Sequence, residues 1–202
     1  MTNHVGGRPR DSKVEAEVLH ATVTLLRDRG YASLRINDIA EASGAAKTTI
    51  YRRWPTLTHL VVAAMEHAIG DRSFHESGDI AADLDGLIET AFGAFTGEGA
   101  SLIAVALDIH RQDDPDLRAG YRERIIDPVR QQAITIIDAA KERGALSGST
   151  ESEAVVDAVI GGLIYRRAVL AEDVSIEQAK TFWRRVIRVP LSEPQAASGA
   201  VR

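Results

Sequence analysis

Apolar residues recur at intervals of three and four along nearly every long segment of this 202-residue chain. This spacing places them on one face of an α-helix, whereas a half-buried strand would alternate apolar and polar residues, and no convincing alternation is seen. With 45% apolar residues, the chain has enough of them to build a packed core. We therefore predict an all-α fold of about nine helices without internal repeats.

The composition excludes several classes of protein. The chain contains no cysteine, so it forms neither disulfides nor cysteine metal sites, in keeping with a reducing compartment. Its first ten residues are polar and do not resemble a secretory signal, and apolar runs such as Leu102–Leu107 are far too short to span a bilayer. We expect a cytoplasmic protein that has no membrane partner.

Charge is distributed unevenly along the chain. The net charge of −5 alone argues against nucleic acid. Residues 1–60, however, hold nine Lys or Arg against six Asp or Glu, whereas residues 61–202 hold fifteen against twenty-three. A basic head on an acidic body is expected where only one end of a protein meets phosphate, although solvated faces often differ as much.

Two short helices joined by a glycine turn are predicted near the N-terminus, over residues 36–42 and 46–54. A longer helix over residues 12–29 precedes them, with Ser12 as its cap and Gly30 as its stop. This order is typical of the tri-helical module that reads DNA. In the second short helix Ile50 and Trp54 share one face, so we expect its other side chains to point outward.

The outward side chains of that helix suit contact with double-stranded DNA. Arginine binds guanine through two hydrogen bonds, threonine meets a thymine methyl group, and lysine and tyrosine hold phosphate. A solvated basic helix on an ordinary bundle is the alternative. We favour DNA because the turn, the helix lengths and the paired arginines occur together. The predicted contacts are Lys47, Thr48, Thr49, Tyr51, Arg52 and Arg53.

Residues 12–65 resemble the DNA-binding domain of the TetR family of bacterial regulators. Thr49–Pro55, with the sequence Thr-Ile-Tyr-Arg-Arg-Trp-Pro, carries most of the resemblance. The stretch Ile160–Arg167 resembles, less specifically, a C-terminal domain often paired with that head. Further matching positions are Gly30, Tyr31, Leu34, Ile36, Asp38, Ile39, Ala40, Ala42, Gly44, Lys47 and Leu60.

The resemblance implies more DNA contacts, from the start of the first short helix at Arg35 and Asn37. Three positions depart from the family's pattern. Arg35 and Ala46 stand where a Ser or Thr cap is common, and Leu57 replaces a common Lys that contacts phosphate. These departures leave the register of the motif intact, but we expect them to weaken DNA binding if they have any effect.

The first residues form a second hint of DNA binding. Gly7-Arg8-Pro9-Arg10 resembles a hook for the minor groove, in which proline keeps the chain extended and Arg8 or Arg10 enters the groove. A disordered basic tail is an equal alternative. We expect a flexible basic arm over residues 1–11, a DNA-binding domain over 12–57, an effector-binding and dimerisation domain over 58–190, and a flexible tail over 191–202.

The last two predicted helices are expected to form a homodimer interface. One helix-turn-helix offers a small contact area, whereas two-fold dimers read the two half-sites of an inverted-repeat operator. Both helices carry small or apolar stripes that also suit intrachain core, and the family resemblance favours the dimer. The predicted interface residues are Val155, Ala158, Val159, Gly162, Phe182, Trp183 and Val186.

The middle helices are expected to enclose an unknown, largely apolar small-molecule effector, whose binding releases DNA through the helix that begins near Thr58. His110 and Tyr121 are the polar groups expected to orient it. For every one of the lining residues, a role as plain core is the more common explanation. The predicted lining residues are Met65, Ile69, Phe92, Phe95, Ile103, Leu107, His110, Tyr121 and Ile125.

Three alternatives to a ligand-released repressor exist for this sequence. An enzyme is disfavoured because the sequence shows no nucleophile elbow, phosphate loop or dinucleotide fingerprint, and no metal site or cofactor is expected. A helical interaction module without a DNA role, and a repressor or activator that needs no ligand, remain open. The sequence does not separate these two from the repressor that we favour.

Overall fold

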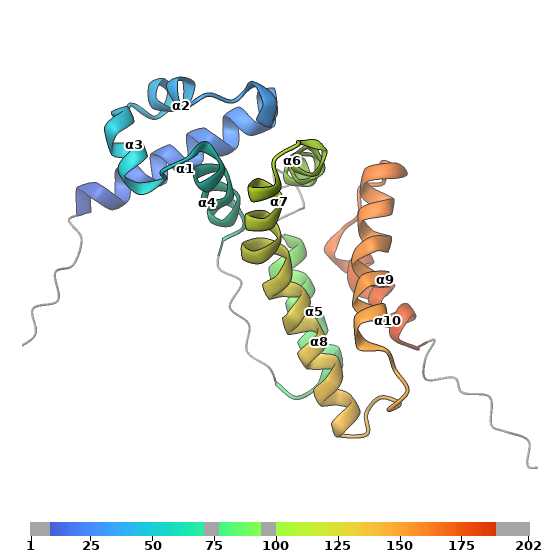
Figure 1. Ribbon diagram of the computed structural model, residues 1–202. Helices are drawn as coiled ribbons and strands as arrows, with labels where there is room; N and C mark the ends of the chain where they lie inside the picture. Colours follow the sequence, from blue (N-terminus) through green and yellow to red (C-terminus); the bar gives the residue numbers. More distant parts are fainter. Residues whose placement is uncertain (1–8, 71–76, 94–99, 189–202) are drawn as a thin grey trace, which may run out of the picture. The chain divides into compact units, whose positions relative to one another are not determined.

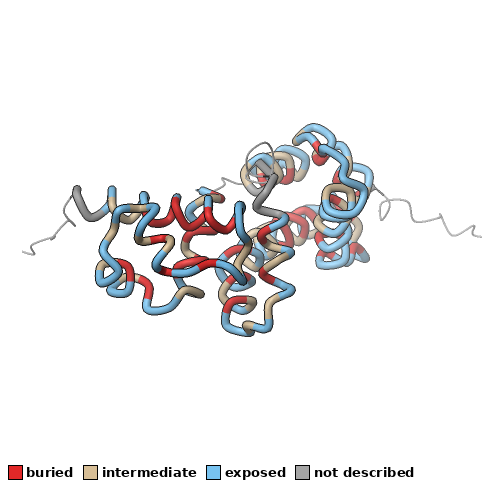
Figure 2. Tube along the Cα trace, turned by 90° about the horizontal axis from the view of Figure 1, so that it is seen from above, coloured by how far each residue is buried: buried red, intermediate tan, exposed pale blue. Residues whose placement is uncertain are grey.

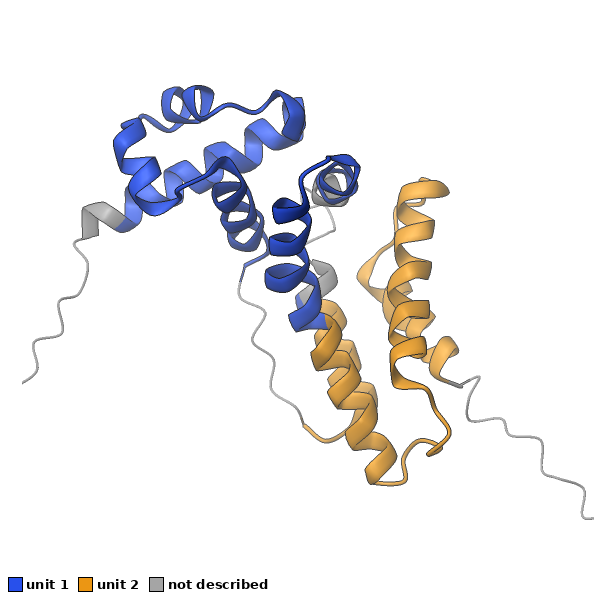
Figure 3. Cartoon of the chain, viewed as in Figure 1, with its two compact units in different colours: residues 1–73, 90–129 blue, residues 74–89, 130–202 orange. Residues whose placement is uncertain are grey.

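The computed structural model describes residues 9–70, 77–93 and 100–188, and every regular element within them is helical, as predicted. Apart from the single-turn helix η1, these residues form nine continuous helices, because α7, η3 and α8 follow one another without a break, as do α9 and η4. Figure 1 shows their order along the chain. The chain divides into two compact units, residues 1–73 with 90–129 and residues 74–89 with 130–202 (Figure 3). We describe each unit by itself.

The first unit is built around the long helix α1 and the apolar helix α4, which lie against each other. Ile39, Ile50, Leu60 and Met65 are fully buried in its core, together with much of α1 (Figure 2). Its elements are α1 (Pro9–Arg29), η1 (Tyr31–Ser33), α2 (Ile36–Ser43), α3 (Lys47–Arg53), α4 (Leu57–Ile69), α6 (Ala100–Arg111), α7 (Pro115–Tyr121) and η3 (Arg122–Ile126).

The packing of α4 bears on the expected boundary at residues 57 and 58. This helix contacts α1 on one side and α7 and η3 on the other, so it belongs to the same compact body as the helix-turn-helix. The expected boundary does not coincide with a division in the packing. It stays a prediction about function.

Helix α1 begins at Pro9 and not near Ser12 as predicted. Proline is favoured in the first turn of a helix because its fixed φ angle suits the helix and its missing N–H needs no partner there. Ser12 therefore lies inside the helix. Glu15, one turn further along α1, forms an ion pair with Arg53 on α3.

The long helix that begins at Pro115 contains a π-helical turn, η3, which closes with a hydrogen bond from the Asp127 N–H to the Arg122 carbonyl. Pro128 has no N–H to donate, and its ring clashes with the carbonyl four residues earlier, at Arg124. The chain accommodates Pro128 within this helix by a wide π turn just before the proline.

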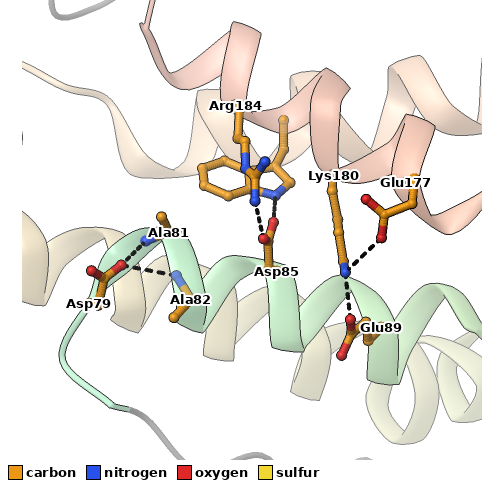
Figure 4. Close-up of polar contacts among 9 residues, drawn as sticks. Asp79, Ala81, Ala82, Asp85, Glu89, Glu177, Lys180 and Arg184 are labelled. Carbon is orange, nitrogen blue, oxygen red and sulfur yellow. Dashed lines mark hydrogen bonds and ion pairs between the residues drawn. The ribbon is translucent and has the colours of Figure 1, made fainter.

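The second unit contains α5 (Ile80–Gly93), which starts in it, α8 (Asp127–Glu142), most of which lies in it, α9 (Ser152–Ile164) with the π-helical turn η4 (Tyr165–Val169), and α10 (Ile176–Arg188). Polar contacts join α5 to α10 (Figure 4). Asp85 accepts a hydrogen bond of 3.0 Å from the Trp183 indole and pairs with Arg184. Lys180 pairs with Glu89 across the same two helices. These contacts fix α10 on α5.

Asp83 is a buried carboxylate next to the start of α5. It accepts hydrogen bonds from the Ser77 N–H and hydroxyl, both 2.6 Å, and from the Gly78 N–H, 3.0 Å. Burial alone would raise the pKa of Asp83, but these hydrogen bonds and the positive charge of Arg143 outweigh burial and lower that pKa. The folded state therefore favours the ionised carboxyl group.

This lowered pKa leads to a prediction about stability. The contribution of Asp83 is complete above the ordinary aspartate pKa of about 3.9 and is lost as the pH falls through the lower folded value. We expect Asp83→Asn to lower the free energy of unfolding by about 1–3 kcal/mol at neutral pH. Urea unfolding should show this difference shrinking below about pH 4. A difference that stays constant down to acid pH would contradict the assignment.

Two further findings concern the described residues only. None of their helices is both long and apolar enough to cross a membrane. They bring together no group of three or more His, Cys, Asp or Glu side chains that could hold a metal ion.

Candidate nucleic-acid interface

The helix-turn-helix consists of α2, a short turn and α3. Gly44 ends α2 with a φ angle of 69°, and its N–H donates to the Glu41 carbonyl. A side chain at this left-handed position would be strained, so glycine suits the turn. Fully buried Ile39 on α2 and Ile50 on α3 belong to the same core, which holds the two helices together. The turn and both helices lie where the sequence predicted them.

Helix α3 has two distinct faces. Lys47, Thr48, Tyr51 and Arg52 are exposed and follow the i, i+4 spacing of a single face. Tyr51 is 49% exposed, which is unusual for so large a ring. The opposite face carries the buried residues Ile50 and Trp54 together with half-buried Thr49 and Arg53. The exposed face offers two cations, a hydroxyl and an aromatic phenol to a groove of DNA.

Arg53 is not part of the exposed face, which corrects our equal treatment of the two arginines. It is half-buried and forms an ion pair with Glu15 on α1. Thr49 is also half-buried on that side. The sequence analysis assigned only Ile50 and Trp54 to the inward face. That face is wider, because Thr49 and Arg53 lie four positions apart and flank Ile50 and Trp54 on the helix surface.

The two residues predicted at the start of α2 are both exposed. Arg35 is the N-cap residue, and its guanidinium donates to the carbonyls of Ala32, 2.9 Å, and Leu34, 2.8 Å. It therefore braces the loop before α2 and still reaches solvent. Asn37 lies in the first turn of α2. Both side chains are accessible to DNA.

The structure also explains the three departures from the family's pattern. Arg35 and Ala46 provide no side-chain cap to α2 and α3, as expected from their chemistry. Leu57 is half-buried and packs against the core of the first unit, so an apolar residue is suited to its place. Thr56, which precedes it, caps α4 by accepting a hydrogen bond of 3.2 Å from the His59 N–H.

The arm is largely outside the described residues. Arg8 lies outside them, and Arg10 belongs to α1 although its side chain is not described. Because α1 includes Pro9 and Arg10, these two positions are helical and do not form the extended hook that was expected over residues 7–10. A role for these arginines in DNA binding stays a prediction.

The predicted effector residues do not gather around one cavity in the described structure. Met65, Ile69, Tyr121 and Ile125 are buried in the core of the first unit, which favours the alternative that they are plain core. Leu107 and His110 are exposed on α6, and the His110 ring meets Tyr121 edge-on with centroids 5.7 Å apart. Phe95 lies outside the described residues, as do the side chains of Phe92 and Ile103.

A groove of about 660 Å³ lies elsewhere, in the first unit. Its wall includes the ion pairs Arg53–Glu15 and Arg124–Glu66. His59 and His67, both on α4, complete its polar lining. The remaining lining residues are Leu19, Trp54, Ala63 and Gly70. The sequence analysis did not identify this groove, because its residues come from α1, α3, α4 and η3 and form no local motif.

The predicted dimer residues are divided between core and surface. Val155 and Trp183 are buried in the second unit. A Cβ atom at Gly162 would lie 2.5 Å from the Phe182 ring, so this glycine lets α10 approach α9 within one chain. These four residues make intrachain contacts, which favours the intrachain alternative for them. Ala158 is exposed, and Val159 and Val186 are half-buried.

Sequence reasoning missed the large apolar side chains that are exposed at the end of α9 and in and after η4. Ile164, Tyr165, Val169 and Leu170 are 41%, 53%, 67% and 48% exposed. A signal was present, because the stretch Ile160–Arg167 was noted for its resemblance. Its apolar residues outnumber the positions that one helix can bury on a single face.

Comparisons with known proteins agree with this architecture. Residues 18–64 match the family model described as bacterial regulatory proteins, tetR family, and residues 74–186 match that described as tetracyclin repressor-like, C-terminal domain. An uncharacterized HTH-type transcriptional regulator of Mycobacterium bovis is 29% identical over 170 residues, which cover 82% of this chain and 83% of the relative.

Solved structures share the fold. A TetR-family regulator from Rhodococcus sp. superposes with a TM-score of 0.68 at 24% identity and covers 90% of this chain and 100% of its own. A transcriptional regulator from Saccharomonospora viridis, in complex with choline, superposes with a TM-score of 0.66 at 20% identity. The match covers 88% of this chain and 96% of the Saccharomonospora viridis chain.

The helix-turn-helix with its exposed face of α3 and the two family matches point to the same conclusion. The second match alone spans more than half of the chain. The chain therefore belongs to the TetR family of DNA-binding transcriptional regulators, which confirms the predicted family and the expectation that it is not an enzyme.

Proposed function

We propose that this regulator is a repressor that binds an inverted-repeat operator as a homodimer and leaves it when a small molecule binds. The observation that carries the proposal is the presence of an exposed surface in each unit. The first unit has the exposed face of α3, formed by Lys47, Thr48, Tyr51 and Arg52 and called the reading face below, and the second has an exposed small and apolar face on α9 and η4. A dimer formed through the second surface would present two reading faces to DNA.

The reading face is supported by its chemistry. Arg52 is the residue we assign to a base edge, because guanidinium binds guanine through two hydrogen bonds. Lys47 and Tyr51 are assigned to phosphates, and Thr48 to a base or a phosphate. Arg35 and Asn37 on α2 would meet the DNA backbone beside them. Arg53 is assigned to holding α3 on α1.

The dimer face is defined here as the exposed stripe of α9 and η4. It runs along positions spaced by three and four and begins with small residues, which allow another helix to come close. A Cβ atom at Gly161 would meet no described atom within 4 Å, in contrast to its neighbour Gly162. The stripe consists of Ala154, Ala158, Gly161, Ile164, Tyr165 and Ala168.

The effector part of the proposal is supported by structural relatives. The Saccharomonospora viridis regulator was solved with choline, and another protein of this fold is described as a flavonoid-responsive regulator. We expect an organic molecule that prefers the protein conformation unsuited to the operator. Its differential affinity for the free and the DNA-bound protein would then set the extent of release.

Selection from random duplex DNA by the purified protein tests the proposal. We expect an inverted repeat whose affinity falls steeply with salt, because the reading faces neutralise phosphates. Enrichment of a single half-site would contradict the dimer. No enrichment at low salt would favour an interaction module. Small-molecule screening against the protein–operator complex then separates an inducible repressor from a ligand-independent regulator.

A further inference from the structure

Tyr31 lies at the corner between α1 and α2, where it begins η1. Two aspartates hold it from opposite ends. Its backbone N–H donates to Asp108 Oδ2 on α6, 2.9 Å away, and its hydroxyl donates to Asp114 Oδ2 at the start of α7, 2.8 Å away. A single residue of the DNA-reading module is thus bound by carboxylates 77 and 83 positions away in sequence.

Both carboxylates are themselves fixed. Asp114 is the N-cap of α7 and accepts a hydrogen bond of 2.9 Å from the Leu117 N–H. Asp108 accepts one of 3.1 Å from the side chain of Gln112, which directly follows α6. Thr58 on α4 donates to Asp114 Oδ2 at 3.1 Å and lies 3.3 Å from the Tyr31 hydroxyl. The contacts therefore join the corner to three helices at once.

Protonation states support these contacts at neutral pH. The pKa of Asp114 is lowered, first by the Leu117 N–H and also by the Tyr31 and Thr58 hydroxyls, against the opposing effect of burial. The pKa of Tyr31 is raised, first by burial and also by Asp114, while Thr58 acts in the opposite direction. The tyrosine thus keeps its proton and donates it to a charged acceptor, which makes a stronger hydrogen bond than a neutral pair.

Apolar packing defines the position of the DNA-reading module less precisely than directional hydrogen bonds do. Burial between α1 and α4 is non-directional, so these helices keep much of it when they shift slightly along each other. Hydrogen bonds weaken steeply when their angle or length changes. The carboxylate contacts therefore specify one arrangement among several that the apolar core tolerates.

We propose that Asp108 and Asp114 form a carboxylate clasp on Tyr31 that positions the DNA-reading helices on α6 and α7. Tyr31 and the two aspartates are positioning residues, since none lies on the reading face of α3. The inference rests on the proposed function, because the clasp matters most where two reading helices must match two half-sites a fixed distance apart. Loosening it leaves each reading face intact and broadens the range of half-site spacings.

The test compares two duplexes, one with the selected inverted repeat and one with a single half-site. We expect Tyr31→Phe and Asp114→Asn each to weaken binding to the inverted repeat by about tenfold and to leave half-site binding unchanged. The double variant should lose little more than either single one, because Tyr31→Phe removes and Asp114→Asn weakens the same charge-assisted hydrogen bond. Binding should also tolerate added or removed base pairs between the half-sites better than wild type does.

Asp113→Asn is the matched control, since it removes the same charge from the exposed residue next to Asp114. It should bind both duplexes as wild type does. Equal weakening on the two duplexes would show that the clasp supports only the fold of the reading module. Unchanged binding to the inverted repeat would also overturn the proposal.

A measurement without DNA separates failure of the clasp from failure of the proposed function. In the free full-length protein, amide hydrogens of Tyr31 and of η1 should exchange faster in Asp108→Ala and Tyr31→Phe than in wild type. Unchanged exchange would overturn the clasp. Faster exchange in a protein that selects no DNA would overturn the operator proposal and the positioning role built on it, while leaving the contacts themselves supported.

Discussion

Arg52→Ala is expected to lower the affinity for the selected operator by about 30-fold or more. Loss of a guanidinium that reads guanine costs about 1–3 kcal/mol, and the proposed dimer carries the substitution twice. Arg52 is exposed on α3, so its removal should leave the free energy of unfolding within about 0.5 kcal/mol of wild type. Titration of labelled operator at several salt concentrations, beside urea unfolding, measures both quantities.

Controls for this prediction come from the chain's other arginines. Arg111→Ala removes an equal charge from an exposed position on α6 and should change operator affinity little. Arg53→Ala breaks the ion pair with Glu15, so it should lower stability as well as DNA affinity. If Arg52→Ala and Arg111→Ala weaken binding equally, Arg52 contributes only general charge and the assignment to a base is wrong.

The elements that the sequence predicted best are those fixed by local rules. Helical spacing of apolar residues located the helices, because one buried face per helix is enough to define each of them. Gly44 marked the turn between α2 and α3, where the φ angle of 69° suits glycine. None of these inferences needed knowledge of a distant part of the chain.

Contacts between segments that are far apart in the chain could not be predicted from the sequence. Arg52 and Arg53 are chemically identical and adjacent, and their different roles depend on packing and on the ion pair of Arg53 with Glu15 on α1. Gly161 and Gly162 pose the same problem, because the Phe182 ring decides which glycine faces the core. Tyr31 was noted only as part of a motif, since its partners Asp108 and Asp114 lie in another region of the sequence.

The most severe effect on assembly is expected from Ala158→Arg, at the centre of the exposed stripe on α9. In a two-fold interface the substitution occurs on both partners, and each buried, unpaired guanidinium costs several kcal/mol. We expect the dimer dissociation constant to rise by about 100-fold or more. Sedimentation should show monomer at concentrations where wild type is a dimer, and affinity for the inverted repeat should fall to that of a half-site.

The fold itself should tolerate this substitution, because Ala158 is exposed and arginine is a good helix former. Ala145→Arg is the matched control, since it places the same side chain at another exposed alanine, in the connection between α8 and α9. It should sediment as wild type does. If Ala158→Arg also remains dimeric, the partner contacts another surface and the stripe on α9 and η4 has a different occupant. A monomeric Ala158→Arg that still binds the inverted repeat at full strength would instead show that assembly is driven by DNA.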